Sequence, residues 1–408
     1  MNAERPTPEE VWRMLEAVHD PELHASIVDL GMVRDVDVDE EGLVGVEIAL
    51  TIAGCPLRTQ IRNDVEARLR GLPGVTGVEV RMGEMGPAER TRVMQTARRK
   101  AQERAPETEV PLRARILAVA SGKGGVGKSS VTVNLAVALA ARGHAVGVLD
   151  ADIWGFSVPR MLGVSGRLGG ADGKIHPNTR EIRGKETLTG RQVGTIKVVS
   201  MGFLVDDEEM ALMWRGLVLA KALEQFLTDV RWGDLDYLLI DMPPGTGDIQ
   251  MALSRLLPRA EVLVVTTPAL AAQKVAVRVA DMARRSYLKV VGVVENMSAF
   301  RCAHGEEYPL FGEGGGAALA RDIGVPLLAR VPLQPGVAEG GDRGAPVAVE
   351  QPDSPAGREF HELARRLAEE LMPPVQMAGC TARIFAAAEA RLAALDAAKA
   401  APGAGATG

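Results

Sequence analysis

The stretch SGKGGVGKSS at residues 121–130 constrains this chain more than any other feature. It satisfies the pattern G-x-x-x-x-G-K-[ST], whose fixed positions are Gly122, Gly127, Lys128 and Ser129. Glycines let backbone N–H groups turn inward around phosphate oxygens, and the start of a following helix adds its positive dipole end. An apolar run at 116–120 precedes the stretch and another at 131–140 follows it. We therefore expect a phosphate-binding loop between a buried strand and a helix.

The loop also predicts its ligands. The residues expected to surround the phosphates are Gly122, Gly124, Gly125, Val126, Gly127, Lys128, Ser129 and Ser130. Lys128 supplies a point charge for the outer phosphates, and the Ser129 hydroxyl is placed to ligate Mg²⁺. A nucleoside triphosphate and Mg²⁺ are therefore the expected cofactors.

Carboxylates follow two apolar strand-like runs downstream of the loop. Asp150 and Asp152 follow the run at 145–149, and Asp241 closes the run at 237–240. Ligands of open α/β sheets bind at the carboxyl ends of the strands, so these side chains should point toward the phosphate loop. Asp241 is the expected second Mg²⁺ anchor, and the turn-rich residues 243–248 could sense the terminal phosphate.

The chain is long enough, at 408 residues, for two to three domains. We expect a small α+β domain at 1–85, a charged helix and linker at 86–113, a phosphate-loop ATPase domain at 114–372, and an alanine-rich helix with a disordered tail at 373–408. The ATPase domain alternates apolar strands with helices, which predicts an α/β fold with a mostly parallel, doubly wound sheet. The Gly-rich residues 164–192 are expected to form a loop or short hairpin.

The small domain shows the order α, β, β, α, β. Thr7 is expected to cap a helix that begins at Pro8, with Glu10 completing a capping box. The expected strands and second helix lie at 33–38, 43–51, 57–72 (the helix) and 75–82.

Composition excludes several functional classes. The formal net charge of −6 and a sequence pI near 5.7 give no general attraction to nucleic acid or anionic membranes, and aromatic content of 3% argues against base stacking. No apolar run reaches the length of a membrane span, and the N-terminus does not resemble a signal peptide. We therefore expect a cytoplasmic protein that binds neither nucleic acid nor membranes. The three scattered cysteines, Cys55, Cys302 and Cys380, suggest free thiols or metal ligands.

A second lysine distinguishes the loop. Lys123 gives the pattern K-G-G-x-G-K-S. This pattern resembles the deviant loop of the dimeric ATPase class that contains partition, septum-placement and iron-sulfur carrier ATPases. In that class the extra lysine reaches the partner protomer's nucleotide. The resemblance implies a homodimer in which Lys123 and Lys128 are both catalytic; the alternative is a solvated lysine at a loop tip.

Other motifs resemble the Mrp/ApbC family of iron-sulfur carrier ATPases. They are D-A-D-I-x-G at 150–155, W-R-G at 214–216, and N-M-S at 296–298. The resemblance implies that Asp152 orients or activates the attacking water, while Asp150 helps to hold Mg²⁺ through water. It further implies that Asn296 reads the adenine edge, favouring ATP, and that Pro332 lines the base pocket. Capping roles are the alternative for both aspartates and for Asn296.

The N-terminal region also carries a family resemblance. The segments DPELHASIVDLG at 20–31 and TIAGCPL at 51–57 are similar to the small iron-sulfur-assembly domain that precedes such ATPases. Cys55 matches a cysteine implicated there in cluster handling. A buried structural cysteine is the alternative.

One segment departs from the family pattern. Iron-sulfur carriers usually hold C-x-x-C after N-M-S, whereas this chain has Cys302, Ala303 and His304. Cys302 and His304 of two protomers could form a four-ligand set, since imidazole replaces thiolate in some clusters. Alternatively, Cys55 could contribute to cluster binding, or the cluster could have been lost.

The leading hypothesis is a homodimeric, Mg²⁺-dependent ATPase that assembles iron-sulfur clusters or transfers them to acceptor apoproteins. A partition-type nucleotide switch that positions DNA or protein cargo is one alternative. An ATP-dependent small-molecule ligase is another.

Overall fold

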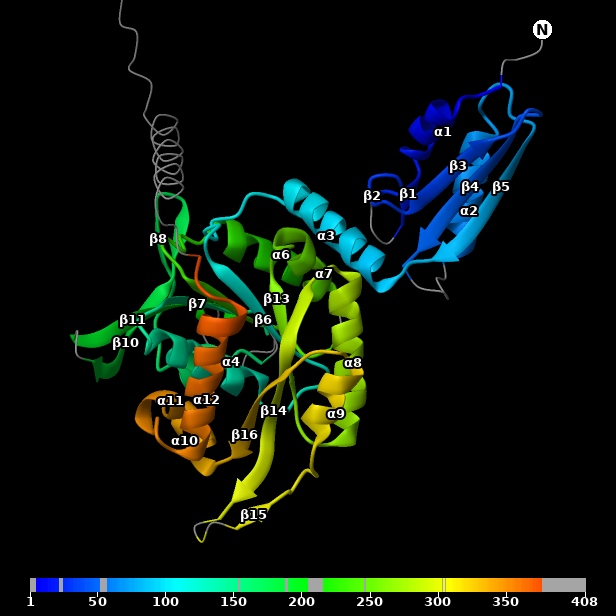
Figure 1. The fold of residues 1–408 in the computed structure, drawn as a ribbon. Helices are drawn as coiled ribbons and strands as arrows, with labels where there is room; N and C mark the ends of the chain where they lie inside the picture. Colours follow the sequence, from blue (N-terminus) through cyan, green and yellow to red (C-terminus); the bar gives the residue numbers. More distant parts are fainter. Residues whose placement is uncertain are drawn as a thin grey trace, which may run out of the picture.

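The computed structural model describes residues 5–21, 25–51, 57–152, 155–187, 190–204, 216–245, 247–302, 304 and 306–375. Their helices and strands form two sheet-based units joined by a long helix (Figure 1). Within the described part of the chain, no helix has the length and apolar character that crossing a bilayer requires.

The first unit is a three-stranded sheet with helices packed against it. Its elements are α1 (Pro8–Leu15), β1 (His19–Asp20), β2 (Ala25–Ser26), β3 (Val33–Val38), β4 (Leu43–Leu50), α2 (Arg58–Leu69) and β5 (Gly77–Glu84). The capping box is confirmed, because the Glu10 N–H donates to the Thr7 hydroxyl while the Glu10 carboxylate accepts from the Thr7 N–H. The predicted order α, β, β, α, β is confirmed as well, with the short β1–β2 hairpin added between α1 and β3.

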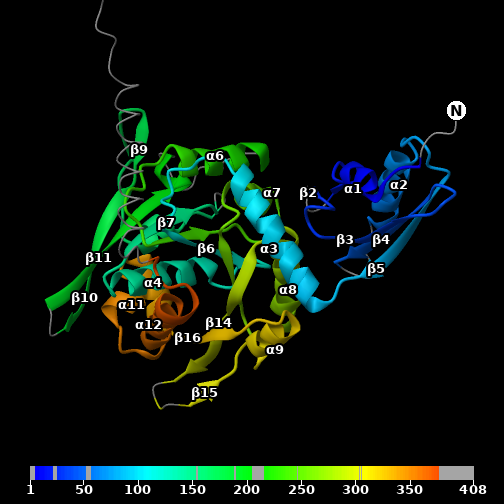
Figure 2. The same cartoon turned by 45° about the horizontal axis from the view of Figure 1, so that its top comes forward.

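Helix α3 (Pro87–Arg104) leads from the first unit to the second. It was expected to be solvated, yet Val93 and Ala97 are buried in the core of the first unit. In Figures 1 and 2 the helix lies beside α8 (Leu270–Arg285), and the Arg98 guanidinium donates to the Tyr287 carbonyl just beyond α8. Lys100 forms an ion pair with Asp29. The basic side chains of α3 are therefore partly engaged within the chain.

The second unit contains a nine-stranded sheet. Its strands are β6 (Arg115–Ser121), β7 (Ala145–Asp150), β10 (Asn178–Thr187), β11 (Gly190–Ser200), β12 (Tyr237–Asp241), β13 (Glu261–Thr266), β14 (Lys289–Arg301), β15 (Glu307–Tyr308) and β16 (Leu327–Leu333). The order is β10-β11-β7-β12-β6-β13-β14-β15, and β16 pairs with β14. Only the β10–β11 and β14–β15 pairs in this sheet are antiparallel. The predicted mostly parallel α/β sheet is confirmed.

Helices cover both faces of this sheet. Successive residues of the central strand β6 point to opposite faces, and both sets are buried. Leu117 and Val119 of β6 pack with α4 (Lys128–Ala140) and α12 (Pro355–Arg366). Ile116 and Ala118 pack instead with α8 and with α6 (Gly216–Thr228), α7 (Asp248–Leu256) and α9 (Gly315–Asp322). Each face therefore has its own buried core. The remaining elements are α5 (Val158–Met161), β8 (Gly169–Ala171), β9 (Lys174–His176), η1 (Met201–Leu204), α10 (Pro335–Asp342), α11 (Val347–Glu350) and η2 (Leu367–Leu371).

The region at 164–192 differs from the prediction of a loop or short hairpin. It contains the β8–β9 hairpin and the whole of β10, which pairs with β11 along its length and extends the sheet. Polar and charged residues dominate β10, NTREIRGKET, so its apolar alternation is too weak to identify a strand from sequence. β10 is identified as a strand by its antiparallel pairing with β11 in the structure.

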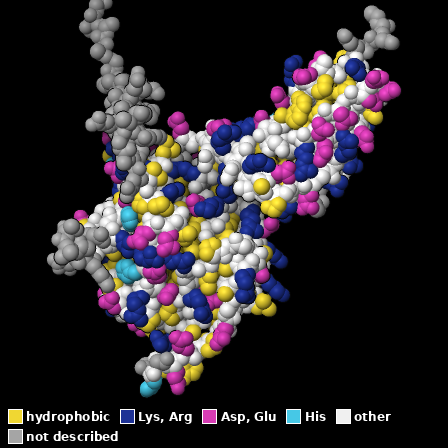
Figure 3. Space-filling model, in the orientation of Figure 1, with side chains coloured by type: hydrophobic (Ala, Val, Ile, Leu, Met, Phe, Trp, Pro, Cys, Tyr) yellow, Lys and Arg dark blue, Asp and Glu magenta, His cyan; other side chains and the backbone are white. Residues whose placement is uncertain are grey.

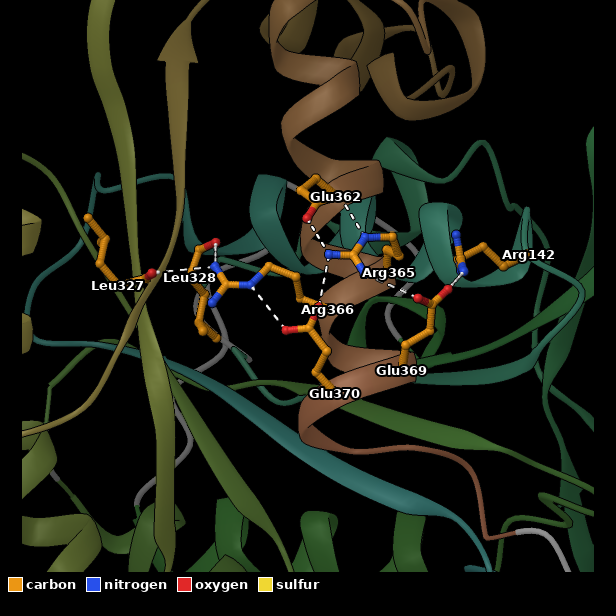
Figure 4. Close-up of polar contacts among 8 residues, drawn as sticks. All are labelled: Arg142, Leu327, Leu328, Glu362, Arg365, Arg366, Glu369 and Glu370. Atoms are coloured by element: carbon orange, nitrogen blue, oxygen red, sulfur yellow. Dashed lines mark hydrogen bonds and ion pairs between the residues drawn. The ribbon is translucent and has the colours of Figure 1, made fainter.

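Charged side chains fix the end of α12. Arg365 lies between the carboxylates of Glu362, Glu369 and Glu370, and Arg142 at the end of α4 pairs with Glu369 (Figure 4). Arg366 donates to the Leu328 carbonyl at 2.6 Å. This network ties α12 and η2 to α4 and β16. On the face shown in Figure 3, basic and acidic side chains are interspersed.

Candidate functional site

The phosphate loop joins β6 to α4, as the sequence predicted. Gly125 and Gly127 have φ angles of +79° and +76°, in the left-handed region that favours glycine. Gly122 is required by close approach, because a Cβ there would lie 2.5 Å from the Val275 carbonyl carbon. The loop encloses a cavity of about 350 Å³. The predicted residues that line it are Lys123, Gly124, Gly125, Val126, Gly127, Lys128, Ser129, Ser130 and Asp152.

A buried lysine lies between two carboxylates at this cavity. Lys128 Nζ is 2.8 Å from Asp241 Oδ1 and 3.4 Å from Asp152 Oδ2. The Ser129 hydroxyl donates to Asp241 Oδ2 at 2.6 Å, and the Thr132 hydroxyl donates to Asp241 Oδ1 at 2.9 Å. The sheet thus brings together Lys128, Ser129, Asp152 and Asp241, as expected from the carboxyl ends of neighbouring parallel strands.

The two aspartates after β7 occupy different environments. Asp150 is fully buried and accepts hydrogen bonds from the Asp152 N–H, the Val158 N–H and the Ser200 hydroxyl. Burial, followed by the nearby charge of Asp241, raises the pKa of Asp150 well above its ordinary value. The structure therefore uses Asp150 to fix the strand-end turn and places it outside the cavity lining.

Asp152 lies at the cavity, with only 14% of its side chain exposed. Burial raises its pKa, while the nearby Lys128 ammonium opposes the rise. A carboxylate in this position can accept a proton or orient a polar ligand in the cavity. Its place at the cavity agrees with the expectation that this side chain points toward the phosphate loop.

The turn after β12 contacts the phosphate loop through its backbone. The Gly245 N–H donates to the Ser121 carbonyl at 2.9 Å, and the Gln250 side chain donates to the Gly245 carbonyl at 2.7 Å. Pro244 lines the cavity. The turn is therefore placed where a change in the occupant of the cavity would reach it.

Lys123 is exposed at the mouth of the cavity. The hydroxyl of Ser121 donates to its backbone carbonyl at 3.1 Å. Among the described residues, no carboxylate lies within ion-pair distance of its ammonium. The Lys123 side chain is therefore exposed beside the loop that lines the cavity.

The two residues predicted to contact the base are not in the described cavity lining. Asn296 is buried on β14, and its side-chain Nδ2 donates to the Val126 carbonyl at 2.9 Å. Pro332 is half-buried on β16. The structure thus places Asn296 against the phosphate loop.

The candidate cluster ligands lie on the loop between β14 and β15. Cys302 is half-buried, and its N–H donates to the Glu306 carbonyl at 2.9 Å. His304 is exposed. Among residues with a described position, no group of three or more His, Cys, Asp or Glu side chains could hold a metal ion. Cys55, Trp214 and Arg215 lie outside the described residues.

Several cavity residues were missed by the sequence reasoning. They come from the segment after β7 and from α10: Ser157, Arg160, Met161, Ala338, Gly341 and Asp342. The glycine-rich sequence of α10 could have indicated that this helix lies near the phosphate loop, since small residues allow close approach of backbone segments. The other positions depend on how separate segments pack.

This fold and site define a P-loop NTPase, in which a glycine-rich loop, its lysine and Asp152 line one cavity and Asp241 contacts the lysine and Ser129. A family model described as NUBPL iron-transfer P-loop NTPase matches residues 113–368, and a second, described as iron-sulfur cluster assembly protein, matches residues 8–80. The chain belongs to the NUBPL iron-transfer P-loop NTPase family. The resemblance seen in the sequence motifs is confirmed.

Two relatives named iron-sulfur cluster carrier protein agree with the family match. A protein from Mycobacterium leprae named iron-sulfur cluster carrier protein is 44% identical over 86% of this chain and 90% of its own. A Bacillus subtilis protein with the same name is 37% identical, covering 88% of this chain and 97% of its own. A solved nucleotide-binding protein in complex with ADP from Archaeoglobus fulgidus is 35% identical over 65% of this chain and 96% of its own, with a TM-score of 0.48.

Proposed function

We propose that this chain is an ATP-hydrolysing homodimer that assembles iron-sulfur clusters or transfers them to acceptor apoproteins. The observation that carries the ATPase part is the convergence of Lys128, Ser129, Asp152 and Asp241 at the phosphate loop. The family match and the relatives named iron-sulfur cluster carrier protein support the proposal that iron-sulfur clusters are the cargo.

The residues at the loop fit a hard divalent cation. The Ser129 hydroxyl and the Asp241 carboxylate already lie 2.6 Å apart, and oxygen atoms of these kinds are the ligands that Mg²⁺ prefers. These two side chains would hold Mg²⁺, which supplies positive charge to the phosphate oxygens.

The remaining roles in ATP hydrolysis belong to groups of the protein. Backbone N–H groups of the loop bind the phosphates, and the Lys128 ammonium stabilises negative charge that develops on the transferred phosphoryl group. Asp152 orients the attacking water. The Lys128 ammonium also pairs with Asp152 and Asp241, so it links the loop to both carboxylates.

Lys123 would act across the dimer. Its exposed ammonium at the cavity mouth can reach the nucleotide of a facing protomer, as an arginine finger supplied in trans does. Lys123→Ala should lower the turnover of ATP by roughly 10³-fold and leave ATP affinity nearly unchanged. The assay is steady-state phosphate release with calorimetric ATP binding.

Lys221→Ala is the matched control, because Lys221 is an exposed lysine on α6. It should retain the turnover of the unmodified chain. Equal turnover in the Lys123 and Lys221 variants would remove the cross-dimer role.

The sequence leaves three hypotheses for cluster binding: Cys302 and His304 are the ligands, Cys55 contributes, or the cluster has been lost. Cys302 and His304 lie at one loop, so two protomers could contribute four ligands from these positions. Cys302→Ala and His304→Ala test this arrangement in anaerobic reconstitution, with bound iron and sulfide as the readout. Cluster retention in both variants would exclude this arrangement, and Cys55→Ala would then test the second one.

A further inference from the structure

The carboxyl-terminal half of β14 passes directly behind the phosphate loop. Asn296 has 5% of its surface exposed, and its Nδ2 donates to the Val126 carbonyl at 2.9 Å. A Cβ on Gly127 would lie 2.2 Å from the same nitrogen. The amide is therefore in contact with two consecutive residues of the loop.

The neighbouring residue holds β14 in place behind the loop. Glu295 is fully buried, its Oε2 accepts from the Gly316 N–H at 2.6 Å, and its Oε1 accepts from Arg330 Nε at 3.1 Å. These contacts join β14 to the start of α9 and to β16. Asn296 thus projects from a strand that is fixed on both sides.

The contact with Val126 has a consequence for the next peptide group. In a trans peptide the carbonyl of one residue and the N–H of the next point in opposite directions. A carbonyl of Val126 that is held toward Asn296 therefore directs the Gly127 N–H away from Asn296. Both Val126 and Gly127 line the cavity, so this orientation makes the N–H available to a phosphate.

We propose that Asn296 is a positioning residue for the phosphate loop, and that its side chain supports phosphate binding whatever the base. This inference rests on the proposed ATPase function. It makes a different prediction from base recognition, because a group that orients a phosphate donor affects every ligand that carries the same phosphates.

The test compares three ligands: ATP, GTP and inorganic tripolyphosphate, which has no base. Asn296→Ala removes the donor, and Asn296→Asp keeps the side-chain volume while replacing the donor with a carboxylate oxygen. Each variant should bind all three ligands about tenfold more weakly, the effect of losing one hydrogen bond to a buried carbonyl. The ratio of ATP to GTP affinity should stay that of the unmodified chain.

Base recognition predicts the opposite pattern. In that case the ratio of ATP to GTP affinity would move toward one while tripolyphosphate binding stayed unchanged, and this result would overturn the proposal. Unchanged affinity for all three ligands would overturn it as well. Asn178→Ala is the matched control, since the Asn178 amide also donates to a backbone carbonyl, at 3.2 Å, but lies at the start of β10 and outside the cavity lining.

Binding of ATP and tripolyphosphate by the unmodified chain distinguishes failure of the positioning role from failure of the proposed ATPase function. If the unmodified chain binds neither ATP nor tripolyphosphate, the ATPase assignment fails. If it binds both and the variants bind them equally well, only the positioning role fails. Far-UV circular dichroism verifies folding, and the Asp variant supplies the result if the Ala variant does not fold.

Discussion

Arg259 anchors the segment between α3 and β6, and its replacement gives a measurable loss of stability. Its guanidinium donates four hydrogen bonds of 2.8 to 3.0 Å to backbone carbonyls of that segment, those of Val110, Pro111, Leu112 and Ala114. Burial lowers the pKa of Arg259 to about 10, so the side chain remains a cation at neutral pH. The perturbation is Arg259→Met, which retains the apolar stem and removes every donor.

The magnitude follows from these four contacts. Hydrogen bonds to a charged group contribute about 1.5–3 kcal/mol each, but removing the cation also removes the cost of burying it. We expect the free energy of unfolding to fall by about 3 kcal/mol, the lower end of the range for breaking a buried charged network. For a domain of this size, that loss lowers the Tm by about 6–12 °C.

Urea denaturation and thermal unfolding measure this loss, with Arg255→Met as the matched control. Arg255 lies four positions earlier, and 66% of its side chain is exposed. Its replacement should change the free energy of unfolding by about 0.5 kcal/mol or less. A loss below about 1 kcal/mol for Arg259→Met, comparable with that of the control, would refute the assignment of Arg259 as an anchor.

Two further substitutions test polar contacts at the start of β12. The His144 ring, whose Nδ1 lies 3.6 Å from Asp236 Oδ2, lowers the pKa of the Asp236 carboxyl. Asp236 therefore contributes stability above its ordinary pKa of about 4, and this contribution disappears as the pH falls through its lowered folded value. The stability difference between Asp236→Asn and the unmodified chain should therefore shrink as the pH falls from about 6 to about 3; a constant difference would contradict this linkage. Tyr237→Phe removes the hydroxyl that donates to the Met372 carbonyl at 2.9 Å and should cost about 1 kcal/mol in urea denaturation, whereas no loss would show that water replaces the contact.

Local patterns predicted the elements that carry strong periodicity or specific chemistry. The strand at 33–38 has the predicted bounds, and Thr7 caps α1 as its sequence indicated. The loop at 121–130 lies between β6 and α4 because its glycines permit a conformation that few other residues adopt. Asp152 and Asp241 approach Lys128 because parallel strands end at one edge of the sheet.

Long-range pairing determined what the sequence patterns did not predict. β10 is a strand because β11 pairs with it, although its own residues are mostly polar. Arg259 meets carbonyls that precede it by about 145 residues, and no periodicity encodes such a contact. Asn296 was identified as a site residue, but the sequence could not show that its amide faces the Val126 carbonyl.

Anaerobic reconstitution with iron and sulfide tests the central claim most directly. The purified chain, desalted after reconstitution, should retain iron and acid-labile sulfide well above the level of a control protein lacking cluster ligands, and should release them to an apoprotein acceptor. Iron and sulfide at the control level would contradict the carrier function, while leaving the ATPase site of Lys128, Asp152 and Asp241 to be judged by its own assay.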